Sequence, residues 1–386
     1  MMQNKRKALI VIAAAVGINL IGGLVYCWSI ISKELILNYD WTNTQASLPF
    51  MTGTMTIAFF MVVGGRIRDK FSPRISALIG GALAGSGLFL SGFFTTPLPL
   101  MITYGFITGA GFGFTGSATT VTAMKWFPAE RRGMVSGICM AGIAFASVYV
   151  SPIINRLIEF YDIHKTFHSI GVAAFAIIIA LGLLLKDPPE TSPVVSGASE
   201  SDWRSIFRKA GFYRLWSIYL LGGSVGLAII SNIAVIALKQ AQWQDGFLLV
   251  MMLAIFNGTG RFASGVILDK IGVRKTFGIV LLMQIANMIC FNSYKTTAIL
   301  SLGTALAGFC YGGMIAAMPA ATAVEFGTKN LGVNWGLVNS AFGFCGILGP
   351  VMAGRIVDIT GSYQYVYLCC AALLIAATIV ASTLKK

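Results

Sequence analysis

Residues 265–275 read GVILDKIGVRK and decide the fold, because a near copy of them lies two hundred positions earlier in the chain. Residues 65–74 read GRIRDKFSPR, with glycine, aspartate, lysine and arginine at matching places. The same offset relates Gly22-Gly23 to Gly222-Gly223. Motifs that recur at an offset of about half the chain length indicate that the chain consists of two structural repeats.

The composition excludes a soluble enzyme. Charged residues make up 11% of the 386 residues, against about 25% in an ordinary soluble protein. Hydrophobic residues make up 56% and the mean hydropathy is +0.79, so a soluble fold would have too little polar surface to cover its apolar bulk. The net charge of +14 does not indicate a nucleic-acid partner, because the basic residues stand in short clusters between apolar runs.

Twelve apolar runs separate these clusters, and each has the length of about 18 residues or more that marks a membrane span. We therefore predict an all-α membrane protein with twelve transmembrane helices in two pseudo-symmetric six-helix halves. The halves are expected at residues 1–185 and 213–386. Residues 186–212 form the predicted cytosolic linker, in which residues 203–209 have the pattern of an amphipathic helix on the bilayer surface. The runs are 8–31, 44–64, 75–95, 98–122, 133–154, 166–185, 213–238, 246–268, 276–293, 297–321, 332–354 and 363–384.

The basic residues assign an orientation to these helices. On the twelve-helix topology, 21 Lys and Arg fall on one side of the membrane and 6 on the other. The side with the excess faces the cytosol, so both termini are expected there. The expected location is the plasma membrane, namely a bacterial inner membrane.

One cation, Arg261, is left inside a span. An ionised arginine near the middle of a membrane helix costs about 2.5–3.5 kcal/mol on insertion scales, and every acidic residue of the chain falls near a span end. Its side chain could extend to the cytosol, but Asp269 at the end of the span is roughly 12 Å away. We predict instead that Arg261 lines an aqueous cavity and that its partner is an anionic substrate.

Other residues in the spans are weaker candidates for the substrate site, since each could equally serve helix packing. They are Tyr26, Trp28, Asn232, Asn257, Tyr311 and Asn339. The charges of the two repeated loops are expected to act in gating or topology: Asp69, Arg74, Asp269, Lys270 and Arg274. Residues 111–116 spell G-x-G-x-x-G, but they lie in an apolar span and follow no strand, so they predict close helix packing and no nucleotide site.

The repeated loop resembles the signature of the major facilitator superfamily. Residues 125–128 (KWFP), Tyr311-Gly312-Gly313 and residues 26–29 (YCWS) resemble the oxalate:formate antiporter family and the related monocarboxylate transporters. The resemblance implies alternating access and a substrate carboxylate bound by Arg261. The family's oxalate exchanger has a second cation, a lysine, where Phe342 stands here. Related monocarboxylate transporters have an aspartate, a proton carrier, where this chain has Asn257.

These observations predict a secondary transporter for a lactate-like or pyruvate-like monocarboxylate, because one arginine matches one carboxylate. Phe342, Tyr26 and Trp28 would pack the short apolar tail. The coupling is expected to be anion exchange or proton coupling. The alternatives are an oxalate/formate-type dicarboxylate exchanger and a carboxylate sensor that transports nothing. No enzyme chemistry, cofactor or metal site is expected, because the spans contain neither paired carboxylates nor a histidine cluster. We expect a monomer whose partners are the substrate, the lipid bilayer and, under proton coupling, protons.

Overall fold

The computed structural model describes residues 2–189, 203–243 and 247–384, and within these ranges it contains helices and no strands. Twelve helical segments are long and apolar enough to cross a membrane. The predicted all-α fold with twelve spans is therefore confirmed. Of the predicted linker 186–212, residues 190–202 lie outside the described residues.

The helices of the first half begin with a span made of three pieces. They are α1 (Met2–Gly22), η1 (Gly23–Cys27), α2 (Trp28–Asn38), α3 (Asn43–Lys70), α4 (Pro73–Ser91), α5 (Pro97–Leu100), η2 (Met101–Thr108), α6 (Gly109–Lys125), η3 (Ala129–Arg131), α7 (Arg132–Phe160) and α8 (Ile163–Gly182). The second half contains η4 (Trp203–Arg208), α9 (Ala210–Ala241), α10 (Phe247–Ile271), α11 (Val273–Phe291), α12 (Thr297–Phe326), α13 (Leu331–Thr360) and α14 (Gln364–Ser382).

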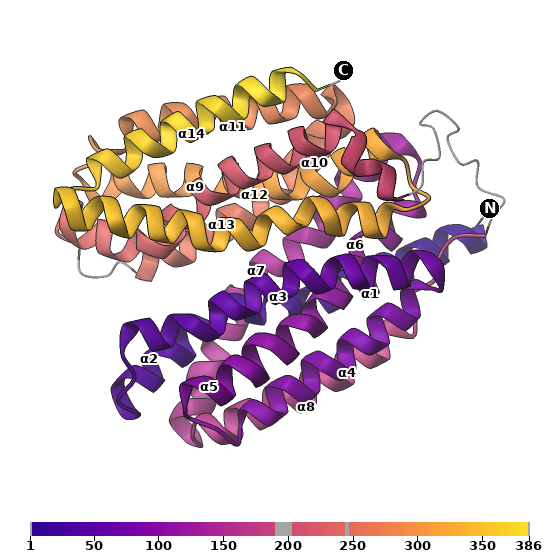
Figure 1. Cartoon of the computed structure of the whole chain (residues 1–386), viewed down its shortest axis with the longest axis horizontal. Helices are drawn as coiled ribbons and strands as arrows, with labels where there is room; N and C mark the ends of the chain where they lie inside the picture. The colour runs from indigo at the N-terminus through magenta and orange to yellow at the C-terminus, as the bar shows by residue number, and fades with distance from the viewer. Residues whose placement is uncertain (1, 190–202, 244–246, 385–386) are drawn as a thin grey trace.

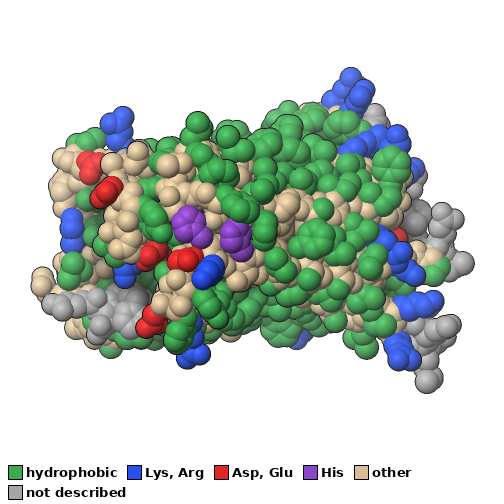
Figure 2. Space-filling view, turned by 90° about the horizontal axis from the view of Figure 1, so that it is seen from below, with side chains coloured by type: hydrophobic (Ala, Val, Ile, Leu, Met, Phe, Trp, Pro, Cys, Tyr) green, Lys and Arg blue, Asp and Glu red, His purple; other side chains and the backbone are tan. Residues whose placement is uncertain are grey.

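The two sets of helices form two bundles that lie side by side (Figure 1). Large apolar side chains such as Phe59 and Leu302 are 65% and 72% exposed, which suits contact with lipid chains. Figure 2 shows hydrophobic side chains as a broad band on this face, with many of the Lys and Arg side chains gathered at one end of the molecule. The surface is therefore that of a multi-pass membrane protein.

The first span differs from the continuous helix expected over residues 8–31, because the 3-10 segment η1 interrupts it. This segment begins at a close approach to α7. A Cβ atom on Gly23 would lie 2.1 Å from the Cβ atom of Ala146 and 2.5 Å from the carbonyl oxygen of Ile143. Glycine is therefore needed at this position.

The bundles contact one another mainly where α3 packs on α13 and where α7 packs on α10. Both crossings are close enough to require glycine. A Cβ atom on Gly65 would lie 2.3 Å from the carbonyl oxygen of Gly332, and one on Gly265 would lie 2.2 Å from that of Gly133. Gly65 and Gly265 are repeat counterparts, so the two crossings are built alike.

Two aspartates from the repeated loops join the bundles at the ends of α3 and α10. Asp69, at the end of α3, accepts hydrogen bonds from the backbone N–H groups of Gly332 (3.2 Å) and Val333 (2.8 Å) in the first turn of α13. Asp269, at the end of α10, accepts from Gly133 and Met134 in the first turn of α7, both at 2.7 Å. A carboxylate is favourable at a helix N-terminus, so both contacts favour packing of one bundle on the other.

Three other charges of the two loops, Arg74, Lys270 and Arg274, form no ion pair within the described ranges. Lys270 and Arg274 are exposed, and Arg74 is partly buried. Gating roles for these three residues stay predictions.

Arg68, at the end of α3, is a second arginine with a buried side chain. Its side chain is fully buried and forms ion pairs with Asp69 (2.8 Å) and with Asp187. It also donates to the Thr122 hydroxyl at 3.3 Å. Asp187 is more than a hundred residues away in the chain, so only the tertiary structure shows that this arginine is buried and neutralised.

We predict that Asp69→Asn and Asp269→Asn each loosen the first turn of the partner helix. Loss of the charge at a helix N-terminus removes about 0.3–2 kcal/mol, so the amides of residues 332–333 or 133–134 should exchange with solvent about 2- to 30-fold faster. Hydrogen exchange measured by mass spectrometry reports this change.

Asp162→Asn is the matched control, because Asp162 caps α8 through the Lys165 N–H and does not join the two bundles. It should leave exchange at all four amides unchanged. Unaltered exchange in both loop variants would show that the carboxylates do not hold the bundles together.

Candidate functional site

Arg261 lies within α10 at its contact with α7, and 1% of its surface is exposed. A Cβ atom on Gly137 of α7 would lie 2.4 Å from the Arg261 carbonyl oxygen, so the two backbones nearly touch. On the α12 side, a Cβ atom on Gly312 would lie 2.0 Å from the Asn257 carbonyl oxygen. The Tyr-Gly-Gly motif therefore lets α12 approach the turn of α10 that carries Arg261.

The Arg261 guanidinium is held at two of its three nitrogens. Nε donates to Asn257 Oδ1 at 2.9 Å, and Nη1 donates to the carbonyl oxygen of Met140 at 2.7 Å. Since Met140 belongs to α7, the second bond joins the two bundles. Nη2 is buried and has no hydrogen-bond partner among the described residues.

Arg261 also differs from Arg68 in its charge balance. Arg68 has two carboxylates beside it, whereas Arg261 has no ion-pair partner within the described part of the chain. A buried charge without a partner is strongly unfavourable, several kcal/mol or more. The site is therefore electrostatically incomplete and favours an anion.

A cavity of about 100 Å³ lies beside Arg261 between the bundles. One water needs about 10–15 Å³ in this measure, so the cavity has room for a small molecule. No aspartate or glutamate of the described ranges lines it, which leaves Arg261 as its one formal charge. Its lining comes from both halves: Asn19, Gly22, Val25, Ile57, Met61, Phe112, Thr115, Gly116, Thr120, Met140, Ile143, Tyr219, Arg261, Ile315, Trp335, Asn339 and Phe342.

The structure brings four of the predicted site residues together. Arg261, Asn339 and Phe342 line the cavity, and Asn257 holds the Arg261 side chain. Asn339 Oδ1 accepts a hydrogen bond from the Tyr219 hydroxyl at 3.0 Å. Whether these residues bind a substrate stays a prediction.

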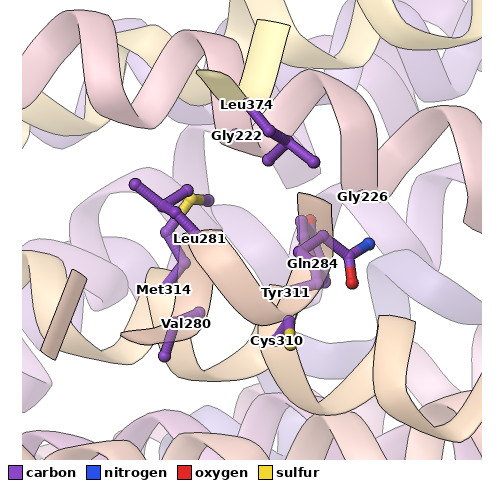
Figure 3. Close-up of a pocket in the computed structure, with 9 residues that line it drawn as sticks. All are labelled: Gly222, Gly226, Val280, Leu281, Gln284, Cys310, Tyr311, Met314 and Leu374. Carbon is purple, nitrogen blue, oxygen red and sulfur yellow. The ribbon is translucent and has the colours of Figure 1, made fainter. Parts of the chain in front are cut away.

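Tyr311 lies in a second, smaller pocket inside the second bundle (Figure 3). This pocket measures about 10 Å³, which is at most enough for one water. A Cβ atom on Gly226 would lie 1.9 Å from Tyr311 Cδ2, so the ring packs α12 directly on α9. The geometry gives Tyr311 a packing position, and it does not line the cavity beside Arg261.

Trp28 and Asn232 also lie away from the cavity lining. Trp28 Nε1 donates to the Ala46 carbonyl oxygen at 2.7 Å, and its ring packs against Tyr104. Asn232 Oδ1 accepts from the Tyr363 hydroxyl at 3.1 Å. The Tyr26 side chain is outside the described part of the structure.

Sequence reasoning did not include Asn19, Tyr219 and Trp335 in the site. Trp335 has a signal in hindsight, because residues 335, 339 and 342 follow the i, i+4, i+7 spacing of one helical face. Asn19 is polar in the middle of the first span, but its amide bonds to Thr119 (2.9 Å) and to the Cys139 carbonyl oxygen (2.8 Å). Nothing in the sequence marks Tyr219.

The pair His164 and His168 is placed for helix contacts. Nδ1 of His164 lies 2.7 Å from the Gly92 carbonyl oxygen, and that of His168 lies 3.0 Å from the Phe89 carbonyl oxygen. Both rings thus meet the last turn of α4.

Comparison with known proteins places this chain in a family. A sequence profile described as "Major Facilitator Superfamily" matches residues 8–291 and 248–386. The chain is 26% identical to an uncharacterized MFS-type transporter, YhjX, of Escherichia coli, over 83% of this chain and 81% of that protein. It is 25% identical to the oxalate:formate antiporter of Oxalobacter formigenes, over 86% and 82% of the two chains. It is 24% identical to monocarboxylate transporter 13 of Bos taurus, over 97% and 88%.

Solved structures share the fold. A crystal structure of the transporter FucP in the outward conformation aligns with a TM-score of 0.75 over 97% of this chain and 98% of that one, at 14% identity. The profile match covers nearly all of the chain, and the twelve helices agree with it. The chain therefore belongs to the Major Facilitator Superfamily, and it is a membrane transporter rather than an enzyme.

Proposed function

We propose that this protein is a secondary transporter that exchanges small monocarboxylates across the plasma membrane of a bacterium, with both termini in the cytosol. The observation that carries the proposal is the buried Arg261, which has no ion-pair partner among the described residues and lines a cavity between the two bundles. Two relatives are named for carboxylates, the oxalate:formate antiporter and monocarboxylate transporter 13, which agrees with an anionic substrate.

A single carboxylate fits the charge of the cavity. The lining has one positive group, and it includes Phe342. The family resemblance implies that the oxalate exchanger has its second cation at the position of Phe342. A second carboxylate beside Phe342 would be buried without a partner, at several kcal/mol. Val25, Met61 and Ile143 add apolar surface that suits a short carbon chain. The alternative is dicarboxylate exchange, and a Phe342 variant distinguishes it from monocarboxylate exchange.

Exchange follows from the same charge. When the cavity holds no anion, reorientation of the halves would move an uncompensated guanidinium through the protein interior, which is unfavourable. A bound monoanion neutralises the guanidinium. Asn257 cannot carry a proton as an aspartate would, so the residue that holds Arg261 offers no proton coupling.

Arg261→Ala is predicted to abolish counterflow of labelled pyruvate in proteoliposomes. Losing one partner of a buried charge pair costs about 2–5 kcal/mol, so affinity should fall by at least about 30-fold. Arg261→Lys should recover only a small part, because one ammonium cannot bond Asn257, Met140 and the substrate in the same planar geometry.

Arg355→Ala is the control, since Arg355 is exposed on α13. It should retain counterflow. Wild-type affinity in Arg261→Ala would contradict the proposal, and pyruvate binding by the wild type without any counterflow would favour the sensor alternative.

Asn257→Asp should make transport depend on protons. The introduced carboxylate, when ionised, would neutralise Arg261 and weaken pyruvate binding, whereas its protonation at lower pH would release the guanidinium for the anion. Affinity in this variant should therefore rise as the pH is lowered. Uptake into vesicles without internal substrate, driven by an imposed pH gradient, should appear in the variant and not in the wild type. Such uptake by the wild type would contradict exchange.

Phe342→Lys should shift selectivity toward dicarboxylates, because a second cation would pair a second carboxylate. The measurement is thermal stabilisation of the purified protein by oxalate, lactate and pyruvate. The wild type should be stabilised more by the monocarboxylates, and the variant more by oxalate. Stronger stabilisation of the wild type by oxalate would contradict the argument from one cation.

A further inference from the structure

Trp335 has an unusual hydrogen-bonding state for a tryptophan of this chain. Its side chain is 1% exposed, and its indole N–H is buried without a partner among the described residues. The indole N–H groups of four other tryptophans each donate to an acceptor 2.7–3.0 Å away. These are Trp28, Trp41, Trp126 and Trp216. An unsatisfied buried donor costs about 1–3 kcal/mol, so this one calls for an explanation.

Trp335, which has the unsatisfied indole N–H, lines the same cavity as Arg261, which has the unsatisfied Nη2. Both residues line it, and both are 1% exposed. The Trp335 ring is held in place, stacked on Tyr219 with the ring centroids 6.2 Å apart and the planes 7° from parallel. Two of the residues that line the cavity therefore each have a buried donor, Arg261 Nη2 and Trp335 Nε1, that nothing in the described protein satisfies.

The two donors come from the same half. Arg261 is on α10 and Trp335 on α13, and both helices belong to the second bundle. A rocking motion of one half against the other would leave their relative positions unchanged, whereas it would alter the bond from Arg261 to Met140 on α7. A ligand bound by this pair would therefore be carried with the second half.

We propose that the Trp335 N–H is the second donor of the carboxylate site, so that one carboxylate oxygen accepts from Arg261 Nη2 and the other from Trp335 Nε1. The inference rests on the proposed function and deepens it. The pair supplies one charge and two donors, which matches a monoanion with two acceptor oxygens. Both donor atoms are covered in this conformation, so the anion reaches them only after neighbouring atoms move.

A role in packing alone gives a different expectation for substitution. Phenylalanine can stack on Tyr219 as the indole ring does, but it has no N–H group. Trp335→Phe thus removes the hydrogen-bond donor and keeps an aromatic ring at this position. The matched control is Trp216→Phe in the same bundle, whose indole N–H already donates to the Ser340 hydroxyl at 3.0 Å.

The experiment measures binding of acetate and of pyruvate to the full-length purified protein, by equilibrium binding and by ligand-induced thermal stabilisation. Trp335→Phe should lower the binding affinity for both acids by about 10- to 100-fold, as expected for a lost hydrogen bond to a charged group. Trp216→Phe should leave both affinities unchanged. An equal loss for the two acids supports donation to the carboxylate, the group that they share.

Two results would overturn the inference while the proposed function stands. One is wild-type affinity of Trp335→Phe for both acids alongside loss of binding in Arg261→Ala. The other is a loss for pyruvate alone, which would assign the N–H to the keto oxygen. Binding of neither acid, nor of lactate or formate, by the wild type would instead count against the proposed function.

A spectroscopic readout serves if Trp335→Phe does not fold. In wild-type protein labelled with ¹⁵N at the indole nitrogens, acetate should move one indole N–H proton resonance downfield, as a new hydrogen bond to an anion does. Saturating acetate that stabilises the protein but shifts no indole resonance would overturn the inference.

Discussion

A guanidinium that is buried near the contact of two membrane bundles, with no carboxylate beside it in the described part of the chain, is the constraint on which the site depends. Burial of a charge is tolerated in proteins when hydrogen bonds and an opposite charge replace water. Arg261 has the hydrogen bonds, to Asn257 and the Met140 carbonyl oxygen, but among the described residues it lacks the opposite charge. The surrounding helices hold the charge in place and leave its neutralisation to a ligand.

The contrast with Arg68 lies in the ion-pair partners of the two arginines. Both side chains are buried to the same degree. Arg68 is neutralised by Asp69 and Asp187, so it stabilises the end of the bundle where the halves meet. Burial alone therefore does not distinguish the two arginines. The difference is that Arg68 has carboxylates beside it and Arg261 has none among the described residues. This difference is why the cavity beside Arg261 is the candidate site.

Closure of one end and formation of the cavity are linked through the repeat. Asp69 and Asp269 occupy equivalent places and cap α13 and α7, the helices that also carry Trp335 and Met140. Close glycine contacts along the same crossings fix the separation of the helices. The helix ends that join the halves and two of the residues around Arg261 therefore lie on the same two helices, α7 and α13.

The sequence by itself determined the twelve spans, the repeated loop and the place of Arg261 inside a span, because hydropathy, a recurring motif and an isolated charge in an apolar run can be read directly from the sequence. Only the tertiary structure placed Trp335 and Tyr219 at the cavity, moved Tyr311 to a packing position and buried Arg68. In a membrane helix every face is apolar, so residue type does not show which face meets a neighbouring helix. Whether a polar side chain is satisfied depends on partners a hundred residues away, which packing alone brings together.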